Sequence, residues 1–143
     1  MLLPVTLIVA AACGLLNLWL AIRCARLRIA GRTLHGDGGN PALGRRMRAH
    51  ANFTEYTPII LILMALIELA AGASPWLWAA GALYVAARVA HAFGMEAERP
   101  TAWRAGGIIA TWLILLGLTA AAVTIAYSAT RPVPAPPALA AQA

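Results

Sequence analysis

The sequence predicts an all-α integral membrane protein with four transmembrane helices in one bundle. Hydrophobic residues make up 62% of the 143 residues and charged residues 11%, against roughly 25% charged in an ordinary soluble domain. Four apolar stretches lie at about residues 2–22, 53–71, 76–95 and 105–127. Each has roughly the 20 residues that a helix needs to cross a bilayer core at about 1.5 Å per residue.

The first stretch starts near the N-terminus without the basic segment that opens a cleaved signal peptide, so we expect it to remain as a helix. Residues 23–50 form the longest polar segment, and its glycines at residues 36–39 predict a loop. Residues 72–75 (GASP) predict a tight turn between the second and third helices. We assign residues 1–128 to one membrane domain and the Pro/Ala-rich residues 129–143 to a disordered tail.

The arginines predict the topology. They lie mainly in the first and third connections, at Arg23, Arg26, Arg28, Arg32, Arg45, Arg46, Arg48, Arg99 and Arg104, with Arg131 alone on the other side. The positive-inside rule places both connections in the cytoplasm and both termini outside. Because the basic residues flank apolar stretches, anionic lipids and topology explain the net charge of +6 better than nucleic acid does. We expect membrane lipids as partners and no nucleic acid.

A polar stripe enters the second apolar stretch. On a helix, Arg48, Asn52 and Glu55 fall within about 60° of one another. Ionisable groups at membrane depth are costly, so they usually face a bundle interior and serve a function there. The stripe is therefore the first candidate for a site.

Two further groups are predicted to meet this stripe. Arg88 and His91 lie one turn apart on the third helix, and Arg104 begins the fourth. With the predicted topology, all three groups lie at one leaflet and can form a cationic pocket. Such a pocket suits a small anion that also bears an amine, since arginine forks hold carboxylates and Glu55 can receive an ammonium group.

Structural interpretations of the same residues remain open. Arg48 and Arg104 can be interface arginines that reach towards water, and Glu55 can pair with Arg88 as a structural ion pair. Glu68 lies about 20 Å further along the second helix than Glu55, and we interpret it as an interface or inter-subunit residue. The three histidines lack metal-ligand spacing, so no metal site is predicted.

The motif RAHANFTEYTP at residues 48–58 resembles the signature of the MAPEG family, the membrane-associated proteins of eicosanoid and glutathione metabolism. Arg88, His91 and Arg104 match the family at the expected spacing, and the resemblance covers about residues 1–128. The sequence HAFG at residues 91–94 is most similar to the bacterial branch. The resemblance implies a homotrimer in the bacterial inner membrane, with both termini periplasmic and glutathione bound between subunits near the cytoplasmic side.

The resemblance also implies individual roles. Arg104 corresponds to the arginine that stabilises the glutathione thiolate and is the predicted catalytic residue. A cation beside a thiol favours its anion, and the thiolate is the nucleophile. The implied glutathione-binding residues are Arg26, Arg48, Asn52, Glu55, Arg88 and His91.

Departures from the family pattern leave two functions open. Ala51, Met95, Ala105 and Ile108 replace an arginine, a tyrosine, a serine and a tyrosine of the prostaglandin-synthesising member, so prostaglandin synthesis is not expected. The leading hypothesis is a transferase or peroxidase that uses a glutathione thiolate against lipophilic electrophiles from the bilayer. The alternative is a non-catalytic membrane protein that binds lipid or a partner. A small transporter is less favoured, because the stretches lack broken helices.

Overall fold

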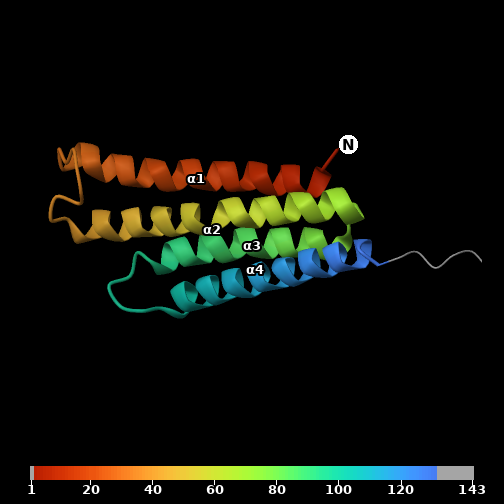
Figure 1. Cartoon of the computed structure of the whole chain (residues 1–143). Coiled ribbons are helices and arrows are strands. Elements are labelled where there is room, and N and C mark those ends of the chain that lie inside the picture. Colours follow the sequence, from red (N-terminus) through yellow and green to blue (C-terminus); the bar gives the residue numbers. More distant parts are fainter. Residues whose placement is uncertain (1, 132–143) are drawn as a thin grey trace, which may run out of the picture.

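A computed structural model describes residues 2–131 and contains four α-helices that run antiparallel to their sequence neighbours (Figure 1). They are α1 (Pro4–Ala30), α2 (Pro41–Ala71), α3 (Pro75–Gly94) and α4 (Ala102–Ala129). The predicted all-α class is confirmed. Of the predicted tail, residues 132–143 lie outside the described residues.

The helices α1, α2 and α4 are long and apolar enough to cross a membrane. The described helix α3 is not among these three. Its 20 residues include Arg88 and His91. Large apolar side chains are exposed on the outer surface, among them Leu15 (72%) and Leu116 (66%). An apolar outer surface of this kind is typical of a protein that faces lipid.

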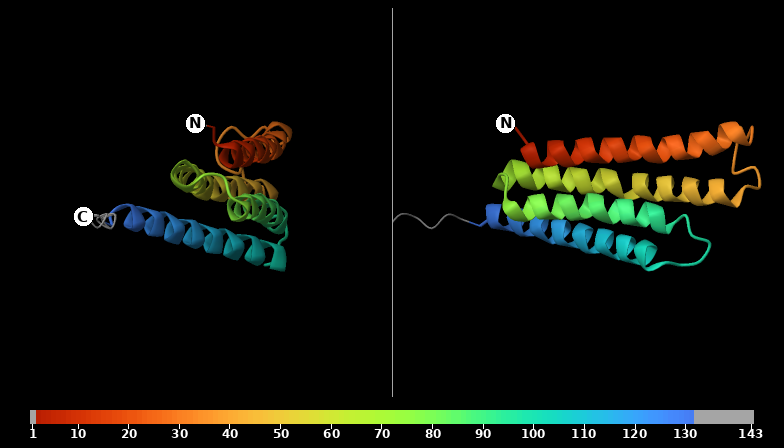
Figure 2. Two further views of the ribbon diagram at one scale, coloured as in Figure 1. Left: turned by 90° about the vertical axis from the view of Figure 1, so that its right-hand side faces the viewer. Right: turned by 180° about the vertical axis from the view of Figure 1, so that it is seen from behind.

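The helices form three layers. α1 packs on α2 and α3, and α4 packs on the same two helices from the opposite side. Figures 1 and 2 show α1 and α4 at the two edges of the bundle with α2 and α3 between them. Val9, Phe53, Met64, Tyr84 and Leu118, which come from all four helices, are buried in the shared core.

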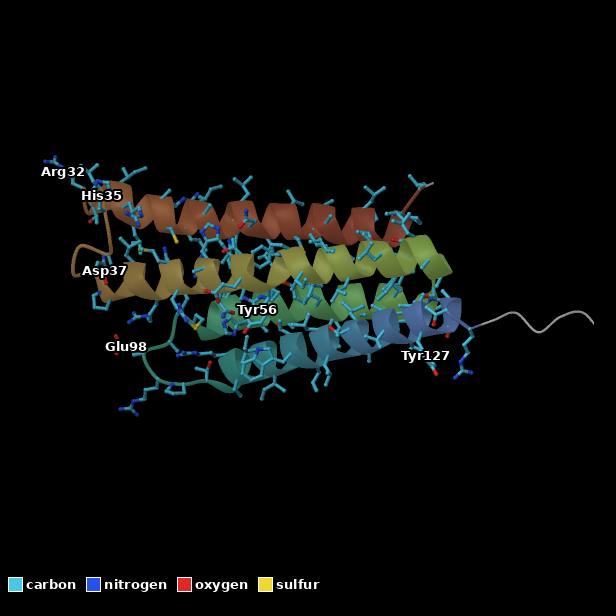
Figure 3. The ribbon with its side chains drawn as sticks, viewed as in Figure 1. Arg32, His35, Asp37, Tyr56, Glu98 and Tyr127 are labelled. Atoms are coloured by element: carbon cyan, nitrogen blue, oxygen red, sulfur yellow. The ribbon has the colours of Figure 1, made fainter. Side chains whose placement is uncertain are left out.

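The connections α1–α2 and α3–α4 lie at one end of the bundle, which we call the arginine-rich end (Figure 1). The N-terminus and the end of α4 lie at the other. Figure 3 shows Arg32, His35 and Asp37 of the first connection at the same end as Glu98 of the second. The prediction that the two arginine-rich connections share an end is therefore confirmed.

Two helices extend further than their apolar stretches. α1 continues past residue 22 to Ala30, and α2 begins at Pro41 rather than near residue 53. The side chain of Asn40 accepts hydrogen bonds from the backbone N–H groups of Ala42 (3.0 Å) and Leu43 (3.2 Å), which stabilises the start of α2. The polar stripe of α2 is consequently held on a regular helix.

Glu68 corrects a prediction. It is 1% exposed and lies inside the subunit, so its interpretation as an interface or inter-subunit residue is wrong. Its Oε1 accepts a hydrogen bond from the Val5 N–H (2.9 Å), and its Oε2 accepts one from the Thr6 N–H (2.8 Å). Those N–H groups have no partner within α1, and a carboxylate is favoured at a helix N-terminus. Glu68 therefore anchors the start of α1 to the end of α2.

We expect Glu68→Ala to lower the free energy of unfolding by about 1–2 kcal/mol, because the first turn of α1 loses its acceptors. Thermal unfolding in detergent measures the change. Glu98→Ala is the control, since Glu98 is exposed in the α3–α4 connection. Equal stability of the two variants would show that Glu68 does not anchor α1.

Candidate functional site

A cavity of about 160 Å³ opens between α2, α3 and α4 near the arginine-rich end. Its walls carry six side chains, which are Arg48, Asn52, His91, Met95, Arg104 and Ile108. Four of these belong to the predicted site, and they come from three different helices. The structure therefore brings Arg48, Asn52, His91 and Arg104 to one cavity.

Two predicted residues lie outside this set. Glu55 is exposed on α2 and Arg26 is exposed near the end of α1, and neither lines the cavity. The alternative that Glu55 pairs with Arg88 is not supported, because the ion pairs found within residues 2–131 are made by Glu96. No carboxylate lines the cavity, so Arg48 and Arg104 leave it with a positive charge.

Arg88 lies behind the cavity wall rather than in it. The side chain is 2% exposed, and its Nη2 donates a hydrogen bond to Asn52 Oδ1 (2.9 Å). Its Nη1 lies 3.5 Å from Thr111 Oγ1, and its guanidinium carbon lies 5.9 Å from the centroid of the Phe53 ring. Because a guanidinium only donates, the amide oxygen of Asn52 must face Arg88, which leaves the Asn52 NH₂ group available as a donor.

His91 is held in one tautomer by α4. Its Nδ1 lies 3.0 Å from the backbone oxygen of Arg104. A carbonyl oxygen only accepts, so Nδ1 must carry the hydrogen. In the neutral ring Nε2 is then an acceptor, and it has no hydrogen-bond partner in the part of the chain that the structure describes.

Two glycines bring α3 and α4 close enough for this contact. A Cβ atom on Gly107 would lie 2.6 Å from the Ala87 oxygen and 2.7 Å from His91 Cβ, and one on Gly94 would collide with the Arg104 backbone. Neither glycine was among the residues predicted for the site. The available signal was a glycine inside an apolar helix, which costs about 1 kcal/mol relative to alanine and therefore indicates close packing.

We expect Gly107→Ala to lower the free energy of unfolding by about 1–3 kcal/mol, because the new methyl group forces α3 and α4 apart. Thermal unfolding in detergent tests this. Gly117→Ala on the same helix is the matched control, since a Cβ atom there has no neighbour within 4 Å. A Gly107→Ala variant as stable as Gly117→Ala would contradict the close crossing.

Comparison with known proteins agrees with this architecture. The family model described as "MAPEG family" matches residues 6–124. The chain belongs to the MAPEG family. The protein named "Inner membrane protein YecN" from Escherichia coli strain K12 is 35% identical over 113 residues, which cover 78% of this chain and 85% of that protein. The same protein from E. coli strain CFT073 matches equally well. The resemblance to bacterial members is thus confirmed, and the chain is a multi-pass membrane protein.

Two of the four residues that differ from the prostaglandin-synthesising MAPEG member lie in the cavity wall. Met95 and Ile108 both line the cavity, where the resemblance places tyrosines. The other two departures, Ala51 and Ala105, are exposed and lie outside the lining. The cavity therefore combines cationic and amide donors with two apolar walls.

Proposed function

We propose that this MAPEG protein is a glutathione-dependent transferase or peroxidase of the bacterial inner membrane that acts on lipophilic electrophiles. The observation that carries the proposal is the convergence of Arg48, Asn52, His91 and Arg104 on one cavity. The lining side chains offer two guanidinium groups and one amide donor, and no carboxylate lines the cavity. Such a set suits an anionic ligand with carboxylate groups.

The size of the cavity favours a site completed by another subunit. A volume of about 160 Å³ is small beside the roughly 300–1,000 Å³ of most small-molecule pockets. A tripeptide would therefore extend beyond the walls of one subunit. We propose a homotrimer in which exposed residues of a neighbouring copy, Arg26 or Glu55, contact the protruding part of glutathione.

The chemistry follows from the charge at Arg104. A guanidinium beside the glutathione thiol favours the thiolate, which is the nucleophile. The neutral ring of His91 offers Nε2 as an acceptor for the thiol hydrogen. In transfer, the sulfur forms a bond to an electrophilic carbon, and the leaving group departs with its electron pair. In peroxide reduction, the thiolate sulfur attacks one peroxide oxygen, the O–O bond breaks, and the other oxygen leaves as an alcohol (or water) after protonation. A second glutathione then attacks the sulfenic sulfur, which forms the disulfide and releases the first oxygen as water.

We also propose that α3 crosses the membrane with the other three helices and that the arginine-rich end is cytoplasmic. The arginines of the two connections and of the adjoining helix ends favour this orientation, and α3 runs alongside three helices that are long enough to span. Alkaline phosphatase fused to the C-terminus should then be active, since this reporter folds only in the periplasm. An inactive but intact fusion would reverse the orientation.

The apolar walls favour a second candidate function. Met95 and Ile108 remove two hydroxyl groups that the prostaglandin-synthesising pattern directs at glutathione, and they make the cavity more suitable for an acyl chain. A non-catalytic MAPEG protein that binds lipid or a partner would need no activated thiol.

Titration of glutathione into the detergent-purified protein at neutral pH separates these two functions. The thiolate absorbs ultraviolet light more strongly than the thiol does. A saturable increase in absorbance is expected from a site that binds glutathione and ionises it. No increase would rule out activation of glutathione and favour the lipid- or partner-binding protein.

A further inference from the structure

An apolar furrow runs along α3, away from the candidate site. It consists of two adjoining cavities of about 390 and 520 Å³, both of which contact Ala86. Neither shares a lining residue with the cavity that contains Arg104. The furrow extends from Trp78 near the start of α3 to Phe93 near its end, about 22 Å along the helix axis.

The shape and chemistry of the furrow suit an acyl chain. Small side chains form its floor, at Gly81, Ala82, Ala86 and Ala90. Half of a bilayer core is about 15 Å thick, so the furrow is long enough for one acyl chain of the leaflet at the arginine-rich end. At that end Trp103 is 70% exposed, and exposed tryptophan is typical of the head-group level.

An arginine with an unused donor lies beside this end of the furrow. The guanidinium of Arg23 lies 4.3 Å from the ring centroid of Trp19 and 5.9 Å from that of Phe93, which lines the furrow. The Arg23 side chain is 12% exposed. Its Nη1 is buried and has no hydrogen-bond partner within residues 2–131. If the Arg23 side chain turns outward, a phosphate oxygen would give this donor the acceptor that it lacks.

The local charge is also unbalanced. Glu96 pairs with Arg23 and, at 2.9 Å, with Arg46. One carboxylate therefore neutralises only one of two guanidinium groups, which leaves a positive charge beside the furrow. Because arginine forks bind phosphate oxygens well, the remaining charge favours an anionic head group over a zwitterionic one.

We propose that the α3 furrow holds one acyl chain of an anionic phospholipid and that Arg23 binds its phosphate. The lipid binds outside the cavity that contains Arg104, so this site is independent of the proposed catalytic function. Phosphatidylglycerol and phosphatidylcholine with identical chains distinguish the charge of the head group from the fit of the chain.

Native mass spectrometry of the detergent-purified full chain, titrated with each lipid, tests the proposal. We expect phosphatidylglycerol to bind about fivefold more tightly than phosphatidylcholine, the effect of roughly one basic residue. Arg23→Gln should remove this preference. Ala86→Phe should weaken binding of both lipids about tenfold, because it fills the point where the two cavities adjoin. Ala120→Phe, at an exposed position on α4, is the matched control and should bind as the unmodified protein does.

Glu96→Gln provides a second test if Arg23→Gln does not fold. It keeps Arg23 but removes the competing carboxylate, so affinity for phosphatidylglycerol should rise. Equal affinity of the unmodified protein for the two lipids would overturn the role of Arg23. Unchanged lipid binding by Ala86→Phe would overturn the furrow as the lipid site. Loss of an oligomer in Ala86→Phe, but not in Ala120→Phe, would instead assign the furrow to contact between copies of the chain.

Discussion

Arg104→Ala is expected to reduce glutathione-dependent turnover by about 10²–10³-fold, the usual effect of removing one group that stabilises a developing anion. This substitution removes the guanidinium group without removing the backbone contacts of Arg104. The backbone oxygen of Arg104 holds His91, and its backbone N–H donates to Thr101 Oγ1 (3.2 Å). Alanine retains both contacts, and the Arg104 residue itself is exposed. Turnover of a chromogenic aryl halide and the melting temperature in detergent should therefore respond differently.

The matched control for Arg104 is Arg99→Ala. Arg99 is an exposed arginine of the α3–α4 connection, five residues before Arg104, and does not line the cavity. Its loss lowers the positive charge at this end of the bundle by the same amount. Turnover by Arg104→Ala at the rate of the unmodified protein would exclude the assigned role. An equal decrease in both variants would attribute the effect to overall surface charge.

The second large effect is expected at Asn52. Asn52→Ala removes the 2.9 Å acceptor of Arg88 Nη2 and leaves a cation that is 2% exposed without its best partner. Loss of a hydrogen bond to a buried charged group should lower the free energy of unfolding by about 2–3 kcal/mol. Thermal unfolding in detergent measures this loss. Thr54→Ala, at an exposed position of the same helix, should change stability far less.

Two further variants separate stability from binding at Asn52. Asn52→Asp keeps an acceptor for Arg88 and should retain stability, yet its carboxylate should weaken glutathione binding by repelling an anionic ligand. Adding Arg88→Met to Asn52→Ala should recover stability, because it removes the uncompensated charge. Failure of this double variant to recover any stability would show that Asn52 supports the bundle by some means other than Arg88.

Hydrophobicity explains why so much of the fold was predictable. An apolar stretch of about 20 residues is expected to form a membrane-spanning helix, so the existence and order of all four helices followed from the four apolar stretches. The helix ends were less accessible. α1 continues beyond its apolar stretch to Ala30, and α2 begins before its apolar stretch, at Pro41. Both extensions carry arginines. Backbone hydrogen bonds, and at α2 the Asn40 cap, extend a helix beyond its apolar part.

The candidate site was predictable as a set of residue types, but not as an arrangement. Helical spacing placed Arg48, Asn52 and Glu55 on one stripe, and the predicted topology brought Arg88, His91 and Arg104 to the same leaflet. Spacing along one helix cannot say which neighbouring helix covers each position. The packing of α3 and α4 on α2 decided that Asn52 meets Arg88 while Glu55 remains exposed.

The membrane environment, the shared end of the two arginine-rich connections and the family all follow from the amino-acid sequence. These properties depend on hydrophobicity, charge and motif, which are local in the chain. Three contacts emerge only when the helices pack: Glu68 anchors α1, Gly107 permits the α3–α4 crossing, and His91 bonds to the Arg104 backbone. Each of these contacts joins residues on different helices, and its existence depends on helix rotation and crossing distance, which the packing of the whole bundle sets.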